Sequence, residues 1–259
     1  MFRFTVTLLF AVTASTFLSA AALPECAGPI EIANAQLLRV EKNGTVIFGD
    51  GRAVHLEGIR LPAGVADRAP QAFADKALGT LGWVLSMQPL TLTAVPPKED
   101  RYDRVRGQLF GPGANWVQAA LLKGGLARVS IAPDRTECAT ELFAFEAQAR
   151  AAHAGIWSLP AYAIRTPQTV GRDVGTFQIV EGKVLNAGLK NGRAYLNFGA
   201  DWRTDFTVTV EPEDMAKFRG SGVDPRSYVG QTIRVRGIVQ FLNGPEIEAA
   251  NPQGIEVVP

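Results

Sequence analysis

Two short stretches carry charged side chains of the types that bind phosphate: VHLEGIRLPA at residues 54–63 and DRYDRVRG at 100–107. Their candidate site residues are His55, Arg60, Arg101, Arg104 and Arg106. A guanidinium presents paired N–H donors to phosphate oxygens, whereas a histidine near neutral pH is largely uncharged. Arg60 and Arg104 therefore suit an anion such as phosphate. Arg101, Arg104 and Arg106 form a local basic patch.

The elements that must position these residues can be read from periodicity. Residues 35–61 alternate as a three-stranded meander with a hairpin turn at Asp50-Gly51. Residues 66–87 have the apolar spacing of a helix. Further along the chain, LTLTAV and VRGQLFG predict two strands, and WVQAALLKG and residues 140–153 predict two helices. Five strands and three helices in this order predict an OB-fold barrel over residues 33–158.

The pattern changes after residue 158. Residues 159–173 contain two prolines and no period, which indicates a linker. Residues 174–259 predict five or six strands and one short helix, typical of a second, small all-β OB-like domain. We expect the strands of both domains to be antiparallel throughout. The fold class is thus mainly β with α.

Three stretches of the first domain resemble the staphylococcal nuclease-like, or thermonuclease, family. VHLEGIRLP is similar to the family's V-R-L-x-G-I-D-x-P-E segment, and DRYDRVRG to its D-R/K-Y-G-R segment. NWVQAALLKGGLARV and ELFAFEAQARAAHAGIW resemble its two closing helices. The resemblance, which covers residues 37–157, implies a phosphodiesterase that uses one calcium ion, two arginines and a glutamate.

Most of the implied catalytic groups are missing from this sequence. The resemblance places the first metal-binding aspartate at or near Gly44, the second at Arg60, and the glutamate at Ala63. His55 stands where the family has an arginine, while Arg104 matches the family's second arginine. A guanidinium at a ligand position repels calcium because it does not release its proton. We therefore expect no bound cofactor and no catalysis.

Two functions from different classes remain open. In one, the protein is a non-catalytic module that binds single-stranded nucleic acid or a protein of the cell envelope. In the other, it is a calcium-dependent endonuclease with a site rebuilt from Glu57 and Asp103 around Arg104. If the site is lost, Arg60 is expected to pair with Asp103 or Glu57, or to hold an anion such as phosphate alongside Arg104 without cleaving it. Two or more carboxylates meeting beside Arg104 would favour the enzyme.

The second domain has its own candidate surface. Tyr195, Trp202 and Arg203 combine aromatic and basic side chains, as OB surfaces that bind single strands do. However, residues 174–259 hold nine Lys or Arg against ten Asp or Glu, a net charge of −1, so they offer no excess positive charge to phosphates. Tyr195 could instead be an alternating core position, and Trp202 and Arg203 could join the two domains or contact a protein partner.

The N-terminus resembles a targeting segment. Arg3, an apolar run and Ala20-Ala21-Ala22 predict a signal peptide over residues 1–22, removed on export to the periplasm or the extracellular space. The mature chain would then have no membrane span. In that oxidising compartment Cys26 and Cys138 are expected to form a disulfide, with two buried free thiols as the alternative. The two cysteines and two histidines lack zinc-ligand spacing. The sequence does not indicate an oligomeric state.

Overall fold

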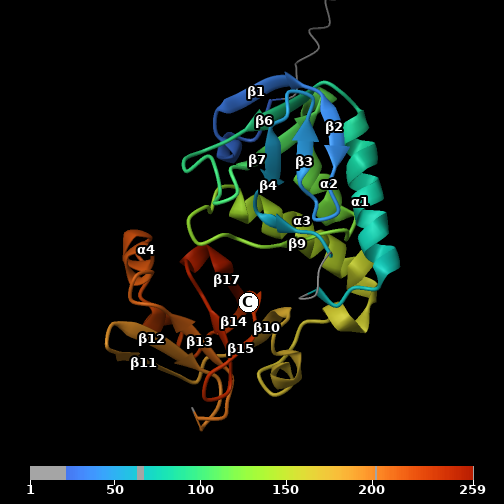
Figure 1. Ribbon diagram of the computed structural model, residues 1–259. Coiled ribbons are helices and arrows are strands. Elements are labelled where there is room, and N and C mark those ends of the chain that lie inside the picture. Colours follow the sequence, from blue (N-terminus) through green and yellow to red (C-terminus); the bar gives the residue numbers. More distant parts are fainter. Residues whose placement is uncertain (1–21, 63–66, 202, 259) are drawn as a thin grey trace, which may run out of the picture.

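The computed structural model describes residues 22–62, 67–201 and 203–258. Nearly all of the expected signal peptide lies outside these described residues, as do Ala63 and Trp202. Two strand-rich units pack against each other, with the N-terminal unit above the C-terminal one in Figure 1. Within the described residues, no helix is long and apolar enough to cross a membrane.

The first unit consists of curved strands and three helices. In chain order its elements are β1 (Ile30–Ala35), β2 (Leu37–Val40), β3 (Val46–Phe48), β4 (Ala53–Leu56), β5 (Ile59–Arg60), α1 (Gln71–Ser86), β6 (Leu90–Thr93), β7 (Val105–Gly111), β8 (Asn115–Trp116), α2 (Val117–Lys123), β9 (Arg128–Val129) and α3 (Ala139–Ala151). The large sheet has the order β1-β6-β7-β4-β3-β2. Its two ends are successive parts of one bent strand, since only Gln36 separates β1 from β2.

The second unit repeats this strand order. Its elements are β10 (Phe177–Lys183), β11 (Asn186–Lys190), β12 (Arg193–Asn197), β13 (Thr207–Val210), α4 (Met215–Gly220), β14 (Thr232–Ile238), β15 (Gln240–Phe241), β16 (Pro245–Glu248) and β17 (Ile255–Val258). β10-β14-β17 form one sheet and β11-β12-β13-β16-β15 the other. An OB fold has five strands, of which the first and the fourth can be bent. Here strand three is β4 or β13 and strand five is β7 or β16. In both units strand three pairs with strand five and a helix lies between strands three and four, which is an OB-type arrangement.

The expectation of purely antiparallel strands is wrong. β4 pairs in parallel with β7, and β13 in parallel with β16. β5, α1 and β6 separate the partners in the first unit, and α4, β14 and β15 separate them in the second, so the chain returns along the sheet in its original direction. A crossover of this length is what parallel pairing requires. The pairing places His55 directly opposite Arg106, so the two candidate stretches meet at one sheet position.

Residues 159–173 are built into the structure between the units. They contain two 3₁₀ turns, Pro160–Tyr162 and Val170–Asp173. The Arg165 amide donates to the Ile179 carbonyl on β10 at 2.8 Å, and its guanidinium bonds Asp173 at 2.8 Å. Tyr162 and Trp157 are buried against Ile179 in a small apolar cluster. This connection therefore fastens the second unit to the end of the first.

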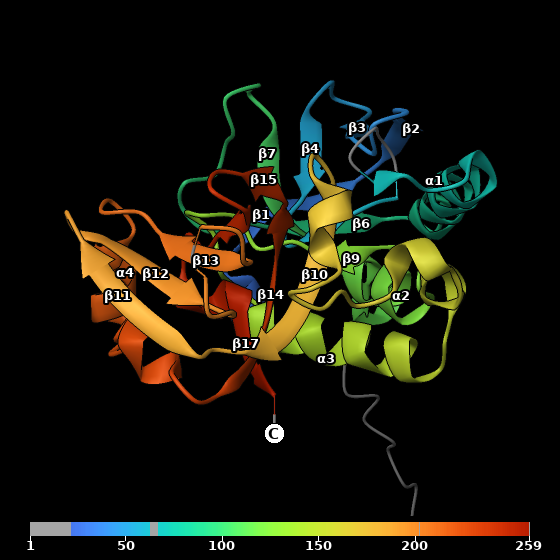
Figure 2. The ribbon, with the colours of Figure 1, turned by 90° about the horizontal axis from the view of Figure 1, so that it is seen from below.

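A buried ion pair joins the units at the centre of their contact. Arg236 on β14 donates to both carboxylate oxygens of Glu146 on α3, at 3.0 and 2.8 Å. Glu146 also accepts from the Val129 amide at 2.8 Å and from Arg150 at 2.6 Å. In Figures 1 and 2, β14 and β17 lie against α3. Glu146 thus holds positive side chains from both units in a desolvated position.

We expect Glu146→Gln to lower the free energy of unfolding by about 3–5 kcal/mol, since it removes the fully buried counter-charge of Arg236 and Arg150 and leaves them the partly exposed Glu256. Urea denaturation measures this loss. The matched control is Glu41→Gln, which removes an exposed partner of Arg39 and should change stability by less than about 1 kcal/mol. Equal effects of the two substitutions would contradict a special role for the buried pair.

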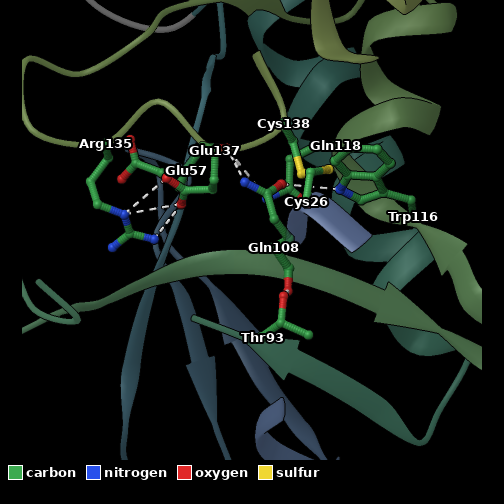
Figure 3. The surroundings of a disulfide bond; sticks show 9 residues. All are labelled: Cys26, Glu57, Thr93, Gln108, Trp116, Gln118, Arg135, Glu137 and Cys138. Carbon is green, nitrogen blue, oxygen red and sulfur yellow. Dashed lines mark hydrogen bonds and ion pairs between the residues drawn. A yellow bond between two sulfur atoms is a disulfide. The ribbon is translucent and has the colours of Figure 1, made fainter. Parts of the chain in front are cut away.

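Cys26 and Cys138 form the expected disulfide, with their Cα atoms 5.0 Å apart. Cys138 immediately follows Arg135 and Glu137, which form a buried ion pair, and Figure 3 shows this pair beside the sulfur atoms. Arg135 also donates to the carbonyls of Pro97 and Arg106, at 2.6 and 3.3 Å. The disulfide therefore anchors a segment that supports both ends of the loop between β6 and β7.

Replacing both cysteines with serine should lower the free energy of unfolding by up to ~4–5 kcal/mol, because the bond closes a loop of 112 residues in the unfolded chain. Denaturation of the oxidised protein and of the double variant gives the difference. Alkylation of the native, unreduced protein should label no thiol. Labelling of two thiols would show that the bond does not form.

Candidate functional site

A cleft of about 740 Å³ opens between the turn after β4, the loop between β6 and β7, and residues 130–134. The β6–β7 loop projects from the sheet beside β7 (Figure 2). The cleft's charged and titratable lining residues are His55, Glu57, Arg60, Glu99, Asp100, Arg101, Arg104, Arg106 and Asp134. The structure thus brings both candidate stretches into one cleft, with four arginines and four carboxylates.

Arg106 forms the floor of the cleft between two carboxylates. Its Nε donates to Glu57 at 2.7 Å, and its two Nη atoms donate to Asp134 at 2.7 and 2.9 Å. Burial opposes the charge on Arg106, but these hydrogen bonds outweigh burial and raise its pKa. The same bonds lower the pKa of Asp134. Glu57 is itself buried, and its carboxylate accepts a hydrogen bond from Arg106.

Arg104 is held by Asp100 and by a hydroxyl from another strand pair. Its Nε donates to Asp100 at 2.8 Å, and its Nη1 donates to Thr45 at 3.0 Å. Burial raises the pKa of Asp100, but hydrogen bonds from Arg104 and from the Tyr102 amide outweigh burial and lower it. Asp100 therefore stays ionised and fixes the direction of the Arg104 side chain.

Tyr102 lines the cleft with two guanidiniums near its ring. The Arg101 guanidinium lies 4.9 Å and that of Arg104 5.3 Å from the ring centroid. Tyr102 is 61% exposed, so a large part of its surface faces solvent. An exposed aromatic ring beside cations is the combination on which nucleic-acid bases stack. Sequence reasoning missed Tyr102 and Asp100, although both lie within the DRYDRVRG stretch.

Asp103 does not line the cleft, although the rebuilt endonuclease site would require it there. Its backbone has φ 57°, in the left-handed region that aspartate tolerates, and it occupies the position of the family's glycine. It is not among the cleft-lining residues. The turn instead directs Asp100, three residues earlier, onto Arg104. One carboxylate, rather than two, binds Arg104.

The expected partners of Arg60 are also wrong. Arg60 bonds Asp67 through Nε at 2.9 and 3.1 Å and through Nη2 at 2.9 Å, rather than Asp103 or Glu57. Its guanidinium lies 5.3 Å from the ring centroid of Phe177 on β10. Gly58, with φ 81°, makes the turn that directs β5 this way. Arg60 therefore borders the cleft and also contacts the second unit through Phe177.

A calcium ion does not fit the carboxylates of this cleft. Three of the four lining carboxylates are paired: Glu57 and Asp134 bind Arg106, and Asp100 binds Arg104. Glu99 alone does not supply the several oxygen ligands of a calcium site. Across the parts of the chain that the structure describes, the only cluster of three His, Cys, Asp or Glu side chains with ligand atoms within 4.8 Å of each other is Cys26, Cys138 and Glu141. Two of these are in the disulfide. Calcium requires several free oxygen ligands.

The candidate residues of the second unit lie elsewhere. Tyr195 on β12 lines a separate pocket, where the guanidinium of Arg193 lies 5.3 Å from its ring centroid. Arg203 lies 3.7 Å from Asp201 in the turn before β13. Neither residue lines the cleft of the first unit. The structure therefore divides the predicted site residues between two surfaces.

Comparison with known families agrees with this geometry. Residues 53–159 match the family described as staphylococcal nuclease homologue. The first unit is a staphylococcal nuclease-like domain. No curated protein matches the chain. The matched range contains both stretches that line the cleft, so most of the cleft belongs to the nuclease-like part of the chain.

His55 provides a pH-sensitive probe of the cleft. Burial lowers its pKa below the ordinary 6.5, with Arg104 and Arg106 contributing and Glu57 opposing. As the pH falls, the unfolded chain takes up this proton before the folded chain does. The stability that neutral His55 contributes is therefore complete above pH 6.5 and is lost as the pH falls towards the folded pKa.

NMR titration should show a pKa below 6.5 for His55. The melting temperature should fall between neutral pH and about pH 5, and this component should be absent from His55→Gln. Asp100 and Asp134 have lowered pKa values, so they take up protons only near or below pH 3.8. Their effect on stability is therefore separable from that of His55. A His55 pKa above 6.5 would contradict the buried, neutral state.

Proposed function

We propose that this protein is exported and that its nuclease-like cleft binds single-stranded nucleic acid without cleaving it. The observation that carries the proposal is the pairing of three of the cleft's four carboxylates with its own arginines. Glu57 and Asp134 neutralise Arg106, and Asp100 neutralises Arg104. A carboxylate held in this way is a poor calcium ligand or general base, because either role requires breaking a desolvated ion pair.

Binding is supported by exposed side chains that line the cleft. Tyr102 offers a stacking surface, and Arg101 and Arg104 stand beside it for adjacent phosphates. Arg101 has no ion pair with a carboxylate among the residues that the structure describes. With one such cation and a net charge of only +1 for the whole chain, we expect modest, salt-sensitive affinity.

Export is supported by the N-terminal sequence and the disulfide. Arg3, the following apolar residues and Ala20-Ala21-Ala22 have the order of a signal peptide. The Cys26–Cys138 bond would persist in an oxidising compartment outside the cytoplasm. A cell-envelope protein is the second candidate ligand for the cleft, since an exposed tyrosine with arginines also suits a protein interface.

The catalytic part is tested by incubating the mature protein with single-stranded DNA and calcium. We expect no degradation and no calcium-dependent change in melting temperature, because an ion that does not bind the native state cannot stabilise it. Degradation that a chelator abolishes would overturn the proposal and support a rebuilt calcium-dependent endonuclease. A chelator-reversible rise in melting temperature would show that the cleft holds the ion.

The binding part is tested by fluorescence anisotropy with a labelled oligothymidylate. Tyr102→Ala should weaken binding by ~1–3 kcal/mol through loss of stacking, and Arg101→Ala should reduce the slope of log affinity against log salt by about one. Arg226→Ala is the matched control, because it removes one exposed arginine, paired with Asp224, from the other unit. No binding by the unaltered protein would favour a protein ligand instead.

A further inference from the structure

The second unit has a pocket of its own, about 440 Å³ in volume, on the face of β11 and β12 and under the turn between β15 and β16. β11 and β12 lie at the edge of the molecule that points away from the nuclease-like domain (Figures 1 and 2). In OB-type folds this face, with the loops between strands one and two and between strands four and five, is a common ligand-binding surface. The pocket is therefore accessible and well placed.

Alternation along β12 builds the pocket floor. Ala194 and Leu196 are buried in the core, so Arg193, Tyr195 and Asn197 point to the opposite face. Gly188 on β11 pairs with Tyr195, and the position of a Cβ atom there is open space. The absent side chain leaves one side of the tyrosine ring uncovered. The result is an aromatic platform with an amide beside it.

The charges in the pocket are largely neutralised by one another. Arg193 lies 2.7 Å from Glu211 and 3.1 Å from Glu246, and it also donates to Thr209 at 3.2 Å. Lys190 is the one lining cation among the described residues for which no such pairing is found. A phosphate chain would have to displace two glutamates to reach Arg193. This arrangement disfavours nucleic acid.

The remaining polar groups suit hydroxyls. The Asn197 side-chain oxygen accepts a hydrogen bond from Thr207 at 3.4 Å. Asn197 lines the pocket, and its amide N–H donors have no hydrogen-bond partner among the described residues. Asn243 lines the opposite wall in the β15–β16 turn. The rim is apolar, because Leu189 is 56% and Leu242 54% exposed. Amides and a carboxylate hydrogen-bond to hydroxyl groups, and the negative face of an aromatic ring attracts polarised C–H groups.

We propose that this pocket binds a neutral oligosaccharide, with one sugar ring stacked on Tyr195 and its hydroxyls bonded to Asn197, Asn243 and Glu246. The charge balance and the aromatic platform both match an uncharged, polyhydroxylated ligand with an apolar ring face. The site is separate from the nuclease-like cleft, so it does not depend on the function proposed for that cleft.

The test uses the full mature chain and three neutral probes: chitotetraose, cellotetraose and maltotetraose at millimolar concentration. Two-dimensional NMR should show shifts from at least one probe, concentrated on Tyr195, Asn197 and Asn243. Tyr195→Ala should weaken that binding at least about tenfold, the loss typical of a truncated aromatic anchor. Asn197→Ala should also weaken it, with an unchanged melting temperature showing that the variant is folded.

The matched control is Trp83→Ala. Trp83 is an exposed aromatic residue of the first unit, on α1, and its removal should leave sugar binding unchanged. Absence of shifts with all three probes would overturn the proposal. Equal binding by Tyr195→Ala would also overturn it. Salt-dependent binding of oligothymidylate at these resonances would identify the face as a nucleic-acid site instead, which is a different function.

Discussion

Buried arginines impose the constraint on which much of this structure depends. A guanidinium does not lose its proton when it is removed from water, so each one must be matched by a carboxylate. Four arginines of the described chain are almost wholly buried. Their pairs are Arg106 with Glu57 and Asp134, Arg128 with Asp67, Arg135 with Glu137, and Arg236 with Glu146 and Glu256. These pairs shape the cleft, support its loop and join the two units.

The same constraint explains why the nuclease-like cleft contains acidic residues but offers few free ligands. Asp67, which does not line the cleft itself, shows the same constraint at its border. It is fully buried and binds Arg60 and Arg128, while Arg128 donates to the Phe177 carbonyl of the second unit at 2.8 Å. The position at which the resemblance implies a calcium ligand has thus become part of the contact between the units. Restoring an aspartate at residue 60 would place it beside Asp67, so recovery of the metal site is coupled to the stability of that contact.

Local pattern was enough to predict the helices and most strands. The presence of two cysteines in a chain expected to be exported also indicated the Cys26–Cys138 bond, since only one pairing of two cysteines exists. The ion-pair partners were not predictable in this way. Asp67 rather than Asp103 binds Arg60, because the partner depends on the turn at Gly58 and on the approach of β10. Parallel pairing was missed because it is a property of chain connection rather than of any single strand.

The two units show how one strand order supports different surfaces. In the first, the parallel pairing of β4 and β7 brings His55 and Arg106 together at the floor of a charged cleft. In the second, β13 and β16 pair in the same manner, but the charges of Arg193, Glu211 and Glu246 cancel beside Tyr195. The fold therefore does not decide what either unit binds. That choice rests on the outward-facing side chains and their pairing. At the cleft, Arg101 has no carboxylate partner among the described residues, whereas Arg193 in the second unit lies beside two glutamates. The second unit is consequently suited to an uncharged ligand, although its strand order is that of a nucleic-acid-binding fold.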